Sequence, residues 1–459
     1  MLHPLLAAIL LAAIYLPVVL TGYSAARRGE ADHAAKNYAG AAGHFQQAAR
    51  LMPWRNDLWE KAGIAAFASG NFSDAIIFLS HPPGLSEQGW AALGHSYLNS
   101  GDLASALRTY QQGLQFHDSR ALYAGLAYIY REQGDWASEV GALKNQIRLD
   151  ISDAYPHYRL GLLLAVLEPQ QALFELMTAS SLDPETDSAV QTLRAALNLS
   201  SVQPDASQNM VAIGRALGLV HEWDLSIAAF EKAITLDPEN AEAWAWLGEA
   251  KQQMGRDGSA ELDHALSLGR ESVVVRALRG LYWNRQEKYS QMLAEYLLAA
   301  RYEPANPAWQ AASGDAYFQI GDLAAALAAY QRAADLAPNE ATYWRLLAVF
   351  CAENGIRVED VGLPAAQQAV RLAPDDPFVL DALGWSYLSS GRYANAEQVL
   401  ADVITRFPGH FPAYIHLAMT HLAQGSRAAA FNQLTYVRDA DAGGEHGGTA
   451  NRLLNQYFP

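Results

Sequence analysis

The stretch "GDLAAALAAYQRAADLAPNE", Gly321 to Glu340, decides the fold of this chain. A small residue, an aromatic residue and an alanine follow one another at Ala326, Tyr330 and Ala333, and Pro338 comes five residues later. Spacings of four and three residues place side chains on one face of an α-helix. Because proline cannot continue the helical hydrogen-bond ladder, the helix must end near it. The stretch therefore predicts an apolar helix that stops before a proline.

The same frame recurs along the chain with a period close to 34 residues. Three pairs of prolines have this separation: Pro204 and Pro238, Pro304 and Pro338, and Pro374 and Pro408. Counting back from Pro53 or Pro304 gives the same types of residue, at the same offsets, as counting back from Pro338. Self-similarity at a fixed period is the sign of a repeat architecture, in which one structural unit is used many times.

Each unit is predicted to be a pair of helices joined by a tight turn. A glycine followed by aspartate or asparagine precedes several of the apolar helices: Gly70-Asn71, Gly101-Asp102, Gly134-Asp135 and Gly321-Asp322. Glycine supplies the left-handed conformation that ends one helix. The aspartate or asparagine then caps the next helix.

The residue types in this frame match a known repeat. The matching residues are Trp90, Leu93, Gly94, Tyr97, Gly101, Ala106 and Tyr110 in one unit, Trp244, Leu247, Gly248, Gly255 and Ala260 in a second, and Gly314, Tyr317, Gly321, Ala326, Tyr330, Ala333 and Pro338 in a third. In these residues the chain resembles the tetratricopeptide repeat (TPR) family. The resemblance implies an all-α fold, a TPR superhelical solenoid of about twelve helical hairpins with a long concave surface. The apolar N-terminal segment is expected to add one transmembrane helix before it.

The spacing of the repeats predicts five segments. Pro184 and Pro204 are 20 residues apart instead of 34, so one helix there is expected to be unpaired. The segments are a transmembrane anchor or signal segment at 1–26, an N-terminal TPR array at 22–186, an unpaired helix and linker at 187–206, a C-terminal TPR array at 207–442, and a capping helix at 443–459, with its helical part at 449–457.

The N-terminal segment contains no acidic residue, lysine or arginine in residues 2–26. An apolar helix of this length can cross a bilayer. We expect a retained single-pass anchor at residues 4–26, with the repeats on the cytoplasmic side because Arg27 and Arg28 follow it. The alternatives are a cleaved signal peptide ending near Ser24, repeats on the extracytoplasmic side, or a buried core helix.

The composition argues against several classes of function. The net charge of −16, without a basic run, argues against nucleic acid as a partner. The single cysteine, Cys351, excludes an internal disulfide or a cysteine-based zinc site and is expected in the core. No nucleotide-binding or hydrolase motif occurs, and the repeats occupy nearly all residues. We therefore expect no enzyme activity, no catalytic residues, no cofactor and no metal.

The concave surface of such an array is the expected binding site. Eight residues on first helices of repeats are predicted to face it: Tyr128, Arg131, Tyr158, Arg215, Glu249, Asp315, Phe318 and Trp385. This mixture of aromatic and charged side chains suits an amphipathic helix or an extended peptide, although some of the aromatic residues would instead pack between repeats. Trp385 is the strongest single candidate, since tryptophan is frequent among residues that dominate binding energy.

The residues of this chain do not imply binding of chaperone tails, which are a known ligand of the family. TPR domains that bind chaperone tails share basic residues and asparagine on the inner helices, and the corresponding positions here hold no such set: Ile64, His95, Leu162, Arg215, Glu249, Asp315 and Trp385. The sequence thus predicts a membrane-tethered, non-enzymatic scaffold that binds or assembles partner proteins at the cell envelope. The alternatives are a secreted or periplasmic binding protein released by signal cleavage, and a permanent accessory subunit of a membrane protein complex.

Overall fold

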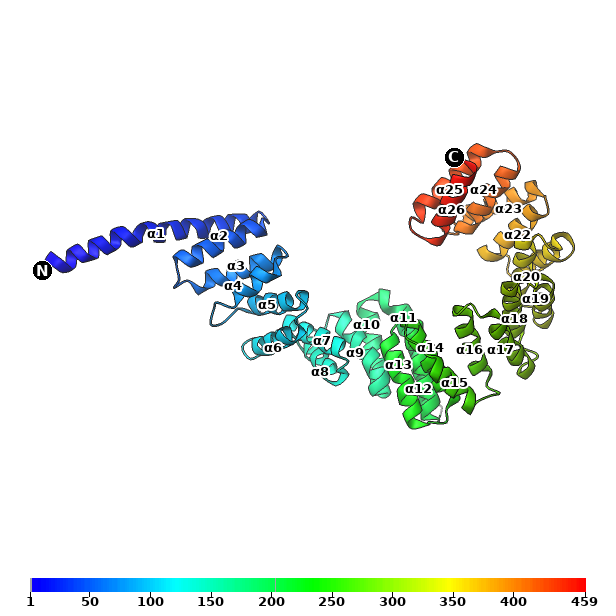
Figure 1. Ribbon diagram of the computed structural model, residues 1–459, viewed down its shortest axis with the longest axis horizontal. Helices are drawn as coiled ribbons and strands as arrows, with labels where there is room; N and C mark the ends of the chain where they lie inside the picture. The colour runs from blue at the N-terminus through cyan, green and yellow to red at the C-terminus, as the bar shows by residue number, and fades with distance from the viewer. Residues whose placement is uncertain (1, 203) are drawn as a thin grey trace. The chain divides into compact units, whose positions relative to one another are not determined.

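The computed structural model describes residues 2–202 and 204–459, without the side chains of residues 2–12, 14 and 200–202. Within these residues the chain consists of α-helices with one 3-10 and one π-helical segment, and it contains no strand (Figure 1). The predicted all-α fold is confirmed there. The chain divides into two compact units, residues 1–229 and 230–459, and the division falls inside one helix.

The first unit is a succession of helices separated by short turns. They are α1 (Leu2–Ala34), α2 (Tyr38–Leu51), α3 (Asn56–Ala68), α4 (Phe72–Leu79), α5 (Glu87–Asn99), α6 (Leu103–Leu114), α7 (Arg120–Gln133), α8 (Trp136–Leu149), α9 (Ala154–Leu167), α10 (Pro169–Leu182), the 3-10 helix η1 (Pro184–Thr186), α11 (Asp187–Val202), α12 (Ala206–Leu219) and the start of α13 (Trp223–Leu236).

The second unit continues the same pattern. Its helices after α13 are α14 (Ala241–Gln253), α15 (Ser259–Leu268), α16 (Val273–Arg285), α17 (Tyr289–Tyr302), α18 (Pro307–Ile320), α19 (Leu323–Leu336), α20 (Ala341–Asn354), the π-helical segment η2 (Val358–Gly362), α21 (Leu363–Leu372), α22 (Pro377–Ser389), α23 (Tyr393–Arg406), α24 (Phe411–Ala423), α25 (Arg427–Ala440) and α26 (Glu445–Tyr457).

Helices within each unit pack as successive hairpins. In the first unit, α3 packs against α4, α5 against α6, and α7 against α8, and in the second unit α18 packs against α19 and α22 against α23. The first helix of a hairpin also contacts the first helix of the next one, as α3 contacts α5 and α20 contacts α22. First helices therefore lie side by side over parts of each unit: α3, α5 and α7, then α9 and α12, in the first, and α14 and α16, then α18, α20, α22 and α24, in the second. We call the first helices the inner layer.

The residues of the repeat frame form the contact between the two helices of a hairpin. A Cβ atom added to Gly94 would lie 2.3 Å from the ring of Tyr110, and one added to Gly280 would lie 2.3 Å from the ring of Tyr296. Real Cβ atoms do not approach so closely, so only glycine lets the aromatic ring of the second helix pack against the backbone of the first. The recurring glycine and aromatic residue thus set the distance between the paired helices.

The turns also follow the prediction. Gly321 has a φ of 90°, in the left-handed region, and ends α18. The side chain of the next residue, Asp322, accepts a hydrogen bond from the backbone N–H of Ala325 at 3.0 Å and so caps α19. That helix ends at Leu336, two residues before Pro338. The longer turn expected in residues 341–376 is the segment that contains η2.

Two predicted features at the ends of the arrays differ in detail. Helix α11 is present, but it packs against α10 and α12 and is therefore not unpaired. The short spacing between Pro184 and Pro204 marks an additional helix, which packs against the helix before it and the helix after it. At the C-terminus, α26 begins at Glu445, four residues before the predicted start, and packs against α25.

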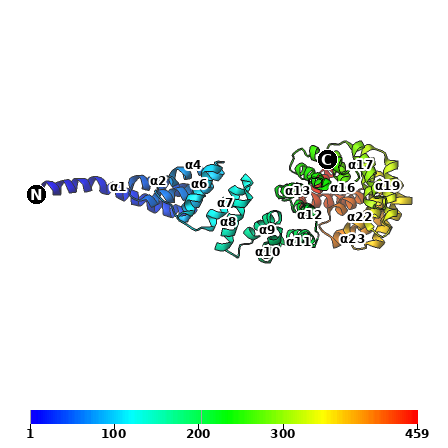
Figure 2. The ribbon, with the colours of Figure 1, turned by 90° about the horizontal axis from the view of Figure 1, so that it is seen from below.

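Helix α1 extends beyond its partner helix. A Cβ on Gly22 would meet the side chains of Leu51 and Met52, so the C-terminal end of α2 lies beside Gly22. The N-terminal part of α1 has no helix beside it in either view (Figures 1 and 2). Accordingly, Leu16 is 57% exposed and Leu20 is 59% exposed.

The described residues include no helix that combines the length and the apolar character needed to span a membrane. Much of the predicted anchor, residues 1–12 and 14, lies outside the side chains that the structure describes.

Candidate functional site

The eight predicted residues lie on first helices of hairpins in both units. In the first unit, Tyr128 and Arg131 are on α7, Tyr158 is on α9 and Arg215 is on α12; in the second unit, Glu249 is on α14, Asp315 and Phe318 are on α18, and Trp385 is on α22. The structure brings together Tyr128 with Arg131, and Asp315 with Phe318, and each pair lines a separate hollow.

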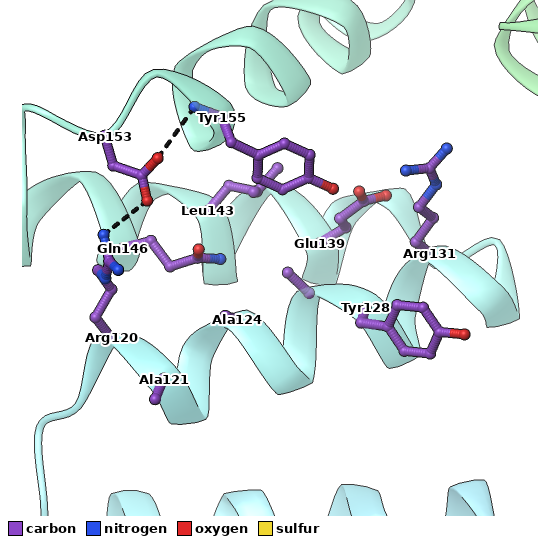
Figure 3. A pocket seen from close by; sticks show the side chains of 11 residues that line it. Arg120, Ala121, Ala124, Tyr128, Arg131, Glu139, Leu143, Gln146, Asp153 and Tyr155 are labelled. Atoms are coloured by element: carbon purple, nitrogen blue, oxygen red, sulfur yellow. Dashed lines mark hydrogen bonds and ion pairs between the residues drawn. The ribbon is translucent and has the colours of Figure 1, made fainter. Parts of the chain in front are cut away.

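The first hollow has a volume of about 220 Å³ and lies between α7, α8 and the start of α9 (Figure 3). We call it the α7–α9 hollow. Tyr128 of α7 and Tyr155 of α9 both line it, and these side chains are 52% and 57% exposed. Figure 3 shows Glu139 of α8 between the two tyrosines and Leu143 beside Tyr155, whereas Gln146 of α8 lies on the side of Arg120 and Asp153. Two accessible aromatic rings therefore flank a floor that α8 supplies.

The floor of this hollow holds a polar group without a partner. Gln146 is 3% exposed, and its Nε2 atom is buried with no hydrogen-bond partner among the described residues. An amide N–H₂ group is a donor only. Burying such a donor unpaired costs about 1–3 kcal/mol. The floor of the hollow therefore contains an unpaired donor, which an acceptor from outside the chain would satisfy once the side chain turns toward the hollow.

The charged groups around the hollow are mostly used within the chain. Arg120 Nη1 lies 2.7 Å from Asp153 Oδ2 and 3.0 Å from Asp150 Oδ2. Arg159 donates to both oxygens of Glu139, at 2.6 and 3.1 Å. Arg120 and Arg159 are thus paired with acidic side chains of the same chain, and these pairs help to position the helices.

Arg159 is charged despite its burial. Desolvation alone would lower its pKa, but the hydrogen bond and charge of Glu139, together with the charge of Glu222, outweigh that effect, so the pKa is raised. Glu222 Oε2 lies 3.2 Å from Arg159 Nη1 and 3.8 Å from Arg131 Nη2. Arg131, half-exposed and held only at the longer distance, keeps most of its guanidinium for other contacts.

The other two predicted residues of the first unit do not line this hollow. Tyr158 is half-buried, and its pKa is raised by desolvation and by the nearby charge of Glu222. Arg215 is exposed on α12.

The second hollow has a volume of about 450 Å³ and lies over α16, α18 and α20. We call it the α16–α20 hollow. Asp315 and Phe318 line it, with Tyr296, Tyr330 and Phe350 around them. The ring centroids of Phe318 and Phe350 are 6.1 Å apart, edge to face. The Tyr330 hydroxyl donates a hydrogen bond to Asp315.

Glu249 is not available on the surface where it was expected. It is 6% exposed, and the Arg285 guanidinium of α16 binds both of its oxygens, one at 2.8 Å. Gln253 donates to the same carboxylate at 2.8 Å. This carboxylate joins α14 to α16 and is already satisfied.

Trp385 is half-buried and stacks on His416 of α24, with ring centroids 4.3 Å apart. His416 Nδ1 lies 2.8 Å from Oδ1 of the buried Asp381. Desolvation would raise the pKa of Asp381, but His416 and His410 outweigh it, so this pKa is lowered. The indole therefore contributes part of its surface to the packing of α22 on α24.

Sequence reasoning missed Gln146, Tyr155 and Tyr296. The first and third lie on second helices of hairpins, whereas the prediction considered first helices only. In the described part of the chain, no group of three or more histidine, cysteine or acidic side chains is placed to hold a metal ion.

The fold and both hollows thus define an α-helical repeat array with an inner layer of first helices. The family model described as "TPR repeat" matches residues 222–255 and 314–355, and the model described as "Tetratricopeptide repeat" matches residues 91–156 and 382–444. The chain therefore contains tetratricopeptide repeats, in both of its units.

Known proteins with similarity to the chain include the "Hsp70-Hsp90 organizing protein" of Triticum aestivum, 34% identical over 104 residues. This match covers 22% of this chain and 18% of the wheat protein. A solved tetratricopeptide repeat protein from Parabacteroides merdae is 14% identical, with a TM-score of 0.43, and covers 55% of this chain and 98% of its own. Yeast Tom70 is 14% identical, with a TM-score of 0.38, and covers 77% of this chain and 91% of its own.

Proposed function

We propose that this chain is a non-enzymatic scaffold that docks segments of partner proteins on its inner layer of helices. The observation that carries the proposal is the buried, unpaired amide of Gln146 on the floor of the α7–α9 hollow. A hydrogen-bond donor kept in such a place is satisfied when its side chain turns toward a carbonyl group that enters the hollow.

The walls of the hollow support the same function. Tyr128 and Tyr155 are large aromatic side chains that are more than half exposed. Tyrosine is among the residues that most often dominate binding energy at protein interfaces. An extended peptide could place a backbone carbonyl on Gln146 and an apolar side chain between the two rings.

The name of the wheat relative describes a protein that organizes Hsp70 and Hsp90. This partnership is not part of the proposal, because the inner helices here lack the lysine and asparagine set of chaperone-tail binders. The docked segment that we propose differs from a chaperone tail, because it would be recognised by the amide of Gln146 and by the rings of Tyr128 and Tyr155.

We expect Gln146→Met to weaken partner binding while leaving the fold intact. Methionine keeps the length of the side chain but removes the donor, so the variant should be at least as stable as the original protein. A lost hydrogen bond of about 1.4 kcal/mol corresponds to a tenfold rise in Kd. The partner is first identified by purification of the full chain in mild detergent, and Kd is then measured with purified components.

The matched control is Gln112→Met, on the exposed face of α6. It should change neither stability nor Kd. A Gln146→Met variant that melts as the original protein does and keeps the same Kd would remove the basis of the proposed function.

The proposal includes a membrane tether formed by residues 4–26, with the repeats on the cytoplasmic side. It is supported by the absence of charged residues in the segment, by Arg27 and Arg28 after it, and by the exposure of Leu16 and Val18 on α1. Because both side chains are exposed, changing them should not disturb the repeats.

We expect Leu16→Arg combined with Val18→Arg to release the protein from membranes. Each arginine near the centre of a spanning helix costs about 2.5–3.5 kcal/mol on insertion scales. The measurement is fractionation after a high-salt wash, with the Leu16→Ala and Val18→Ala pair as the control that should stay membrane-bound. Recovery of the original protein in the washed supernatant, or a mature N-terminus near Ser24, would favour the secreted or periplasmic alternative. A fixed stoichiometric complex would favour the accessory subunit.

A further inference from the structure

The α16–α20 hollow contains two carboxylates that form no ion pair with a cation among the described residues. Asp315 of α18 and Glu353 at the end of α20 both line it. Within residues 2–202 and 204–459, neither forms an ion pair with a lysine or an arginine. Arg285, which ends α16, is bound by Glu249 instead. The hollow therefore carries uncompensated negative charge.

Its walls are aromatic, and one of them offers a further polar group. Tyr296 is 5% exposed and lines the hollow, and its hydroxyl makes no hydrogen bond within the described residues. The hydroxyl of Tyr330 is committed to Asp315. Aromatic rings attract cations through the negative charge on their faces. The two carboxylates and the half-buried ring of Phe318 therefore favour a positively charged ligand, whereas Tyr296, Tyr330 and Phe350 are buried behind them.

The carboxylate of Asp315 is in an unfavourable state in the chain alone. Desolvation raises its pKa, and the hydrogen bond from Tyr330 offsets this only in part. Although Asp315 is exposed in the hollow, even partial removal of a carboxylate from water without a counter-ion costs free energy. A cation brought by a ligand would reduce that cost.

We propose that the α16–α20 hollow receives an arginine side chain carried between apolar residues of a partner protein. This inference rests on the proposed function, because it names the chemistry of a docked segment. A planar guanidinium can hydrogen-bond to a carboxylate in two places and stack on an aromatic ring, which an ammonium group cannot do as well. An acidic segment would be repelled by Asp315 and Glu353.

The test uses the full chain and short synthetic probes. The first probe is the blocked peptide Ala-Leu-Arg-Leu-Ala, and three others replace its arginine with lysine, glutamine or glutamate. We expect the arginine peptide to bind most tightly, the lysine peptide next, and the glutamine peptide at least about tenfold more weakly than the first. Kd is measured by calorimetry at low and at physiological ionic strength.

Variants of the hollow locate the binding site. Asp315→Asn and Glu353→Gln should each raise the Kd of the arginine peptide, by about tenfold for Asp315→Asn. Glu353 is exposed and has no ion pair within the described residues, so its variant should fold normally even if the other is destabilised. Asp335→Asn, an exposed acid on α19, is the control for general attraction to a chain of net charge −16 and should leave Kd unchanged.

Equal binding of the arginine and glutamine peptides, or equal effects of Asp335→Asn and Glu353→Gln, would overturn the inference. A failure of the arginine site can be told apart from a failure of the proposed function, because the two are tested by different variants. If Gln146→Met weakens the natural partner while the peptides show no preference for arginine, the scaffold function remains and only the arginine site is wrong. If the peptides show the preference and Gln146→Met has no effect, the α16–α20 hollow remains as a binding site and the role given to the α7–α9 hollow is wrong.

Discussion

Replacing Glu139 with leucine is expected to destabilise the first unit by about 3–5 kcal/mol. Glu139 is 1% exposed and Arg159 is 4% exposed, and their side chains are joined by hydrogen bonds of 2.6 and 3.1 Å. Without Glu139, the buried guanidinium keeps one acidic partner among the described residues, Glu222 at 3.2 Å. Removing one partner of a buried pair leaves an uncompensated charge, which is far more costly than the pair is favourable.

Two further variants separate this explanation from simple loss of packing. Leucine at both 139 and 159 should recover most of the stability, because no buried charge is left. Asp118→Ala breaks the pair of Asp118 with Arg148, in which both side chains are about half exposed, and should have a much smaller effect. The measurement is hydrogen exchange over residues 120–167, since a chain of two units need not unfold in one step. A double variant as unstable as Glu139→Leu would contradict the argument.

The repeat frame made the fold predictable, because it records contacts that recur in every hairpin. A glycine opposite an aromatic ring, as Gly94 is opposite Tyr110, is a local requirement that any one repeat shows. The caps and turns are equally local, so Asp322 could be assigned from its neighbours alone. Such features need only the residues within one 34-residue unit.

The floor of the α7–α9 hollow was missed although the same frame contained its signal. Glu139, Leu143 and Gln146 stand 33 residues after Ala106, Tyr110 and Gly113. Two small residues at a helix crossing are thus replaced by two long polar side chains. A repeat that departs from its own pattern in this way has a reason to do so, and here the departures are a buried ion pair and a buried unpaired amide.

Contacts between side chains of neighbouring repeats could not be predicted in this way. Glu249 is bound by Arg285, 36 residues away and in the next hairpin, and nothing in either repeat marks the pair. Trp385 stacks on His416 in the same manner, across two first helices. Whether a side chain on the inner layer is free for a partner depends on its neighbour in the next repeat. Of the eight predicted residues, Tyr128, Arg131, Asp315 and Phe318 line hollows for reasons that only the packed helices show.

The second prediction with a large effect tests the repeat architecture itself. Ala326→Trp is expected to cost about 3 kcal/mol or more in the second unit, because Ala326 is fully buried against Tyr330, Leu347 and Phe350 and a large ring there must displace them. In a repeat array each unit contacts mainly its neighbours, so the damage should remain local. Hydrogen exchange should accelerate over residues 307–376 and stay slow over residues 87–154.

The control is Ala328→Trp, on the exposed face of the same helix α19, which should leave exchange unchanged in both regions. Because Tyr330 also lines the α16–α20 hollow, Ala326→Trp should in addition weaken the arginine peptide, while Ala328→Trp should not. If residues 87–154 lost their protection together with residues 307–376, the chain would be unfolding as one cooperative body, and stability could not be a sum of neighbouring repeats. Loosening confined to the second unit would instead show that each hollow is supported by its own group of hairpins, so that one docking site can change while the other is kept.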